Sequence, residues 1–97
     1  SVYATDVDGD GDVDVLGANS YTDDIIWYEN DGSGSFTEYT IADSFDGAYS
    51  VYAADIDSDG DMDVLGAAES ADDITWWEND GNESFTEHTI AGTFDGA

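Results

Sequence analysis

The chain has 97 residues, 40% of them hydrophobic and 13% aromatic, which suffices for one ordinary packed domain and excludes a disordered acidic tail. Its 25 Asp and Glu residues face no Lys or Arg, and the formal charge of −25 excludes nucleic acid as a ligand and disfavours anionic membrane surfaces, because phosphates would be repelled. The absence of Cys excludes disulfides and thiolate metal sites, and no apolar run approaches the roughly 20 residues that span a bilayer, so we expect no membrane insertion.

The first half of the chain predicts four short strands. Each candidate is rich in β-branched and aromatic residues and is bounded by Gly, Asp, Asn or Ser. The four candidates are Val2–Thr5, Asp14–Ala18, Ile25–Asn30 and Phe36–Ile41. Asn-Asp-Gly at Asn30–Gly32 tolerates positive φ and therefore suits a hairpin turn between the third and fourth strands. No segment has the three-and-four apolar spacing of a helix, so we expect an all-β antiparallel meander.

The second half repeats the first at an offset of 49 residues. Of the 48 aligned positions, 15 differ and 33 are identical. The strands recur at Val51–Ala54, Asp63–Ala67, Ile74–Asn79 and Phe85–Ile90. A period of this length is typical of one four-stranded propeller blade. We therefore expect one blade in residues 1–49 and a second in residues 50–97.

Each repeat contains an Asp-rich loop between its first two predicted strands. Both loops fit the pattern D-x-D-x-D-G-x-x-D, at residues 6–14 and 55–63. Calcium prefers six to eight oxygen ligands, and alternating carboxylates on a tightly wound loop can point inward together. By analogy with known calcium loops, the fourth Asp of each loop would give its backbone carbonyl, and the other four their carboxylates. The expected ligands of two Ca²⁺ ions, one per repeat, are Asp6, Asp8, Asp10, Asp12 and Asp14, and Asp55, Asp57, Asp59, Asp61 and Asp63.

Other interpretations of these loops are weaker. Magnesium requires a small, rigid octahedron, and zinc prefers His or Cys, which neither loop contains. An EF-hand needs Glu at loop position twelve and flanking helices, whereas Gly17 and Gly66 stand there. Acidic turns that bind no ion are the remaining alternative, although so many uncompensated acids would repel one another.

The two repeats resemble the FG-GAP and VCBS repeats of integrin-like, bacterial surface and lectin β-propellers. Phe45-Asp46-Gly47 is similar to the opening Phe-Gly of that family, residues 55–63 to its calcium loop, and Leu65-Gly66-Ala67 to its closing motif. The resemblance implies antiparallel four-stranded blades whose calcium loops join the first two strands and have a mainly structural role. It also implies that the chain is not an enzyme.

Aromatic residues suggest both a core and a ligand surface. Trp27 and Trp76 occupy matching positions and are expected to pack between the sheets. Tyr28, Trp77, Tyr21 and Tyr39 are expected to be freer, and could stack on sugar rings as the resemblance to propeller lectins allows. His88 has no His or Cys companion and is expected at the surface or between blades, without a metal.

Two blades alone would leave two sheet faces open, because repeats bury their faces against neighbours. The sequence after Phe94-Asp95-Gly96-Ala97 would by periodicity resume at a match to Tyr49, so the ends fit head to tail. We expect completion by further copies in trans, as three chains with six blades or four with eight, or by neighbouring repeats of a longer chain. A contact that does not close would give a fibre.

The leading interpretation is a calcium-binding structural or adhesive module of an extracellular or cell-surface protein, where millimolar calcium saturates even weak loops. A carbohydrate-binding, lectin-like module and a subunit of an extracellular filament are the alternatives, and another surface protein is a further candidate partner. Asn82-Glu83-Ser84 matches the acceptor triplet for N-linked glycans.

Overall fold

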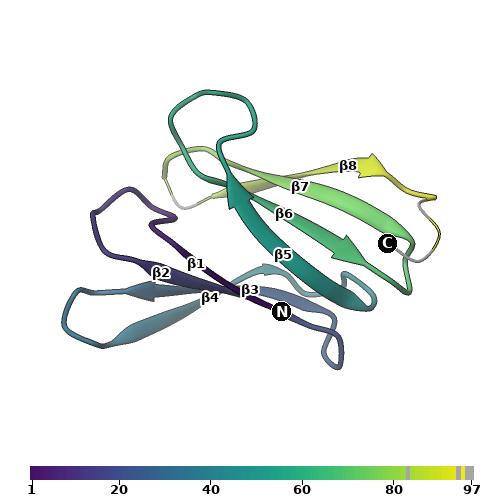
Figure 1. The fold of residues 1–97 in the computed structure, drawn as a ribbon, viewed down its shortest axis with the longest axis horizontal. Coiled ribbons are helices and arrows are strands. Elements are labelled where there is room, and N and C mark those ends of the chain that lie inside the picture. The colour runs from purple at the N-terminus through teal and green to yellow at the C-terminus, as the bar shows by residue number, and fades with distance from the viewer. Residues whose placement is uncertain (83, 94, 96–97) are drawn as a thin grey trace.

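The computed structural model describes residues 1–82, 84–93 and 95, and it contains two four-stranded antiparallel sheets (Figure 1). Each sheet is a meander in which consecutive strands are hydrogen-bonded neighbours. Sheet 1 consists of β1 (Val2–Thr5), β2 (Asp14–Asn19), β3 (Asp24–Asn30) and β4 (Phe36–Ala42). Sheet 2 consists of β5 (Ala48–Ala54), β6 (Asp63–Ala68), β7 (Asp73–Asn79) and β8 (Phe85–Ala91). The prediction of an all-β meander in each repeat is confirmed.

The predicted strand boundaries differ little from the observed ones, with one exception at β5. This strand begins at Ala48 and not at Val51, because Ala48 pairs with Ala68 across a bulge and is buried. The described residues contain no helix of any kind, and so none with the length and apolarity that a membrane crossing requires. Glu83 of the glycan acceptor triplet, and Phe94, Gly96 and Ala97 at the predicted head-to-tail junction, lie outside the described residues.

Sheet 1 presents one face to sheet 2, and Figure 1 shows the two sheets as adjacent layers with β1 and β5 next to each other. Tyr3, Leu16 and Trp27 are cross-strand neighbours on this face. The Tyr3 ring lies 4.6 Å from that of Tyr52, and Trp27 makes an edge contact with Phe85 at 6.1 Å. Leu16 and Trp27 are consequently buried.

Sheet 2 turns its opposite face toward sheet 1. Ala53, Val64 and Trp77 are cross-strand neighbours there and are buried. Phe45, from the segment that connects the sheets, packs edge-on against Trp77 with ring centroids 4.9 Å apart. Gly66 leaves room for this contact, since an added Cβ would lie 2.8 Å from the Trp77 ring. Each large side chain fully buried here contributes about 1.5–3 kcal/mol.

The tryptophans show how the two blades differ. The prediction that Trp27 packs in the core is confirmed, whereas that for Trp76 is wrong, because Trp76 lies half-buried on the outer face of sheet 2. The expectation that Trp77 is freer is also wrong, since it is 2% exposed. Both errors have one cause: sheet 1 is covered on the face that carries Trp27, and sheet 2 is covered on the opposite face.

Candidate metal sites

The first Asp-rich loop connects β1 to β2 and winds around its own carboxylates. The backbone N–H groups of Gly9 and Gly11 each donate to the Asp6 carboxylate at 2.9 Å, and that of Asp10 donates at 3.2 Å. Gly11 has φ +93, which permits this tight winding. The carboxylates are thereby drawn toward the inside of the loop, as the alternating Asp pattern predicts.

The second loop, between β5 and β6, repeats this winding. The backbone N–H of Gly60 donates to Asp55 at 2.9 Å, and that of Asp59 donates to the same carboxylate at 3.1 Å. Ser58 takes the place of Gly9 and has φ +63, a backbone conformation that costs a non-glycine residue about 1–2 kcal/mol. The loop keeps its shape in spite of this local strain.

The carboxylates gather into two clusters that match the donor set of a calcium ion. In the second loop, oxygens of Asp55, Asp57, Asp59 and Asp63 lie within 4.8 Å of one another, and so do oxygens of Asp6, Asp8 and Asp10 in the first. Two oxygens that bind one Ca²⁺ at about 2.3–2.6 Å can be at most about 5 Å apart, so each cluster fits a single ion. Asp14 is not part of the first cluster, and nothing in the structure explains this difference between the repeats.

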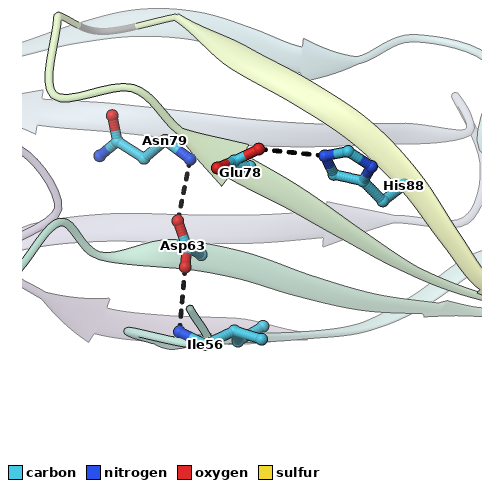
Figure 2. Close-up of polar contacts among 5 residues, drawn as sticks. All are labelled: Ile56, Asp63, Glu78, Asn79 and His88. Atoms are coloured by element: carbon cyan, nitrogen blue, oxygen red, sulfur yellow. Dashed lines mark hydrogen bonds and ion pairs between the residues drawn. The ribbon is translucent and has the colours of Figure 1, made fainter. Parts of the chain in front are cut away.

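Asp63 and Asp14 are fully buried, and their carboxylates connect the loops to the sheets through hydrogen bonds. Figure 2 shows the Asp63 carboxylate between two backbone N–H groups, those of Ile56 and Asn79, each donating at 2.9 Å. Asp14 accepts in the same way from Val7 at 3.1 Å and from Asn30 at 2.8 Å. Each carboxylate thus joins the start of the loop to the third strand, and its remaining lone pairs can still bind a cation.

Asp12 and Asp61 point elsewhere. Their carboxylates lie against Gly32 and Gly81 in the β3–β4 and β7–β8 turns, where an added Cβ would be 2.9 Å from an Asp oxygen. Neither side chain belongs to a carboxylate cluster. Their carboxylates are therefore directed away from the clusters, and the backbone-carbonyl role expected of both residues stays a prediction.

Glu29 of β3 and Glu78 of β7 approach the loops and hydrogen-bond to Asp8 and Asp57, contacts that the sequence did not predict. Burial raises the pKa of Asp8 to about 7, and a hydrogen bond shared with the Glu29 carboxyl adds to the rise. Desolvation likewise raises the pKa of Asp57 to about 6, with a further contribution from Glu78. The close approach of these acids without a cation therefore favours protonated carboxyls. The only available signal was that both Glu residues belong to a segment repeated in the two halves, Trp-x-Glu-Asn-Asp-Gly.

The two loops are also linked to each other. The Asn79 side chain donates to the Met62 carbonyl of its own loop at 3.0 Å and to the Val7 carbonyl of the first loop at 3.2 Å. A pocket of about 430 Å³ lies between the loops, lined on one side by residues 5–9 and on the other by Asp55, Gly60, Asp61 and Met62. The second blade therefore supports the Asp-rich loop of the first.

His88 lies outside both carboxylate clusters. Its ring stacks on Trp76 at 4.7 Å, and its Nε2 is 3.1 Å from the Glu78 carboxylate (Figure 2). The side chain is 43% exposed, so the prediction of a surface position is confirmed. Asp23 accepts a hydrogen bond from the Gly47 N–H at 2.9 Å and so holds the segment between the blades.

The fold and the loops together define a pair of β-propeller blades. A solved structure with this fold is that of a lectin from Agrocybe aegerita, described by its specific recognition of non-reducing terminal N-acetylglucosamine. The match has a TM-score of 0.67 and 22% sequence identity, and it covers 98% of this chain but 25% of that one. The chain thus spans a quarter of the length of the lectin.

The profile of the FG-GAP-like repeat family matches residues 6–66, which is more than half of the sequence. The chain therefore belongs to the FG-GAP-like repeat family, as the sequence resemblance indicated. No curated protein matches it.

Proposed function

We propose that this pair of FG-GAP-like repeats is a calcium-binding structural module of an extracellular or cell-surface protein. The observation that carries the proposal is the convergence of four carboxylates, Asp55, Asp57, Asp59 and Asp63, within the span of one calcium shell. Extracellular calcium is millimolar, which is sufficient to occupy weak sites. The module would then be rigid where calcium is abundant, and its blades would present a surface of fixed shape to an adhesion partner.

Calcium would have a structural role here, because it would connect the loop to the sheet. The exposed carboxylates of Asp57 and Asp59 neutralise the ion from the solvent side, while buried Asp63 connects it to the backbone of β7. Calcium also relieves the repulsion among these carboxylates, which the sequence cannot do with Lys or Arg because it has none. We propose no catalytic role, because the acids of the loops are engaged in holding their own backbone.

Calorimetric titration and thermal melting test this proposal. The wild-type chain should bind two Ca²⁺ ions and prefer them to Mg²⁺, and EDTA should lower its melting temperature. Asp59→Asn should bind one ion, whereas the matched control Asp43→Asn, an exposed acid outside both loops, should still bind two. A melting temperature unaffected by EDTA, or equal stoichiometry in both variants, would reject the proposal.

A carbohydrate-binding role is the second candidate, and one pocket favours it. This pocket, of about 360 Å³, is lined by Ser1, Ser20, Tyr49 and Ser50, and Tyr49 is 63% exposed. An exposed aromatic ring beside hydroxyl groups can stack on a sugar and hydrogen-bond to it. Trp77, which the sequence suggested for this role, is buried and cannot stack on a ligand.

Glycan binding would decide the second candidate. The chain should bind immobilised glycans, with those ending in N-acetylglucosamine included because the structural neighbour is a lectin for this sugar. Tyr49→Ala should remove the binding, while Tyr21→Ala, which alters an exposed tyrosine outside the pocket, should not. No binding to any glycan would exclude this role without affecting the calcium proposal.

A further inference from the structure

Each blade has one covered face and one free face, and these faces are complementary. The free face of blade 1 carries the counterparts of residues that sheet 2 buries against sheet 1. The free face of blade 2 carries the counterparts of residues that sheet 1 buries against sheet 2. We define the blade 1 free face as Val2, Ala4, Val15, Tyr28 and Phe36, and the blade 2 free face as Ile56, Trp76 and Ile90.

Matching residues of the two repeats differ in burial, which shows that each free face lacks the neighbouring blade that covers its counterpart. Val51 is 5% exposed inside the interface between the blades, whereas its counterpart Val2 is 71% exposed. Val7 is 2% exposed, whereas its counterpart Ile56 is 40% exposed. An apolar residue that is buried in one copy of a repeat and exposed in the other lacks the neighbour that covers its equivalent.

The side chains needed to cover these faces are present on the chain itself. Val2, Ala4, Val15 and Phe36 are identical in type to Val51, Ala53, Val64 and Phe85, which pack against sheet 1. On the other side, Trp76 and Ile90 are identical in type to Trp27 and Ile41. The blade 1 free face of a second copy therefore matches the face of blade 2 that already packs against sheet 1, except that Tyr28 stands in place of Trp77. The blade 2 free face matches the covered face of blade 1, except that Ile56 stands in place of Val7.

The first calcium loop receives a hydrogen bond from blade 2, and the second calcium loop has no equivalent bond within the described residues. Asn79 of blade 2 donates to the Val7 carbonyl in the first loop. The equivalent carbonyl in the second loop is that of Ile56, and its donor would have to be an Asn at the position of Asn30 on a following blade. Within this chain the Asn30 side chain donates to Val13 of its own loop, as Asn79 does to Met62, and can serve both acceptors in the same way.

We propose that a second copy of this chain docks its blade 1 free face onto the blade 2 free face, and that its Asn30 supports the calcium loop 55–63. The contact is heterologous, so it continues head to tail until a ring closes or a fibre grows. Closed propellers have four to eight blades, which corresponds to rings of about two to four chains. Calcium in loop 55–63 should strengthen docking and docking should tighten calcium, a coupling that rests on the calcium-binding function proposed above.

Two charge variants test the docking. Val2→Lys places a cation on the blade 1 free face, and Ile90→Lys places one on the blade 2 free face, at positions that are both more than half exposed. Tyr21→Lys is the matched control, because it adds the same charge at a nearly fully exposed residue outside both faces. Circular dichroism verifies that each variant is folded, and light scattering after size-exclusion chromatography gives its mass.

In millimolar calcium, the wild type and Tyr21→Lys should have at least twice the mass of one chain, while Val2→Lys and Ile90→Lys should each be monomeric. An equimolar mixture of the two monomeric variants should give a species of two chains, because each retains the face that the other has lost. A wild type that stays monomeric at all concentrations would overturn the proposal and leave further repeats of a longer chain as the cover of these faces. A mixture that stays monomeric would also overturn it.

Calcium titration of monomeric Val2→Lys separates the two proposals. Calcium binding by this variant supports the metal sites whatever the outcome for assembly. Calcium binding without any assembly of the wild type would reject the docking alone, and assembly without calcium binding would reject the calcium function alone. Assembly that is stronger in calcium than in EDTA supports the coupling, and equal assembly in both refutes it.

Discussion

Asp63→Asn tests whether the buried carboxylate holds the fold independently of calcium. Asp63 is fully buried and accepts two backbone hydrogen bonds at 2.9 Å, from Ile56 and Asn79. Asn offers one acceptor oxygen in place of two, so one N–H group loses its partner, at a cost of about 1–3 kcal/mol. The other bond loses its charge assistance, which adds roughly 1 kcal/mol.

An opposing effect comes from removing one negative charge beside Asp57 and Asp59. At a separation near 4 Å, one such repulsion in water is worth about 1 kcal/mol. The lost hydrogen bonds should therefore dominate, with a net destabilisation of about 1–3 kcal/mol. For a domain of this size the melting temperature should fall by roughly 5–20 °C.

The assay is thermal melting in EDTA, where calcium makes no contribution. The control is Asp59→Asn, which removes the same charge from an exposed carboxylate whose bond to the Asp61 N–H, at 2.9 Å, lies at the surface. In EDTA this control should melt near the wild type or slightly above it, while both variants should lose the gain that calcium confers on the second loop. Equal melting temperatures for the two variants in EDTA would refute the structural role of Asp63.

Three further predictions concern the loops and the interface between the blades. Ser58→Gly should stabilise the chain by about 0.5–1 kcal/mol, because it relieves a φ of +63, and Gly9→Ser should destabilise it by a similar amount; melts that shift in the same direction would contradict this. Gly66→Ala should cost about 1–3 kcal/mol in urea unfolding, since its Cβ would lie 2.8 Å from the facing tryptophan ring, whereas Gly17→Ala, with 3.9 Å of space, should cost much less; equal costs would disprove the close packing. The pKa of Asp8 is raised from 3.8 to about 7, so the folded, calcium-free chain holds a proton that the unfolded chain has released, and its stability in EDTA should fall as the pH rises from about 4 to 7. In calcium the trend should reverse, because the ion requires the deprotonated carboxylate, and parallel pH profiles in melting experiments would contradict this.

The strands could be predicted because their signals are local. Alternating apolar residues and Asp, Asn and Gly at the turns occur within each short segment, and the register follows from the hairpins. The spacing of the Asp residues likewise indicated which carboxylates converge, since one loop contains all of them. Asp14 is an exception, because it stays outside the first cluster although Asp63 joins the second.

The environment of each face could not be predicted from local sequence. Trp27 and Trp76 are identical residues in nearly identical segments, yet one is buried and the other half-buried. The difference arises from which neighbouring sheet is present, and the repeat alone does not contain that information. For the same reason the bond from Asn79 to Val7, which joins residues 72 positions apart, left no local pattern.

The last strand of each sheet limits how the molecule can meet others. β4 and β8 pair on one side only, and their side chains are largely exposed along the whole strand. Glu38 and Glu87 occupy the middle of these edges, and the sequence has no Lys or Arg that could pair with them. Two such edges placed side by side would oppose like charges, which disfavours lengthening of the sheet by addition of strands. These like charges therefore also disfavour the stacking of many chains edge to edge, as in amyloid.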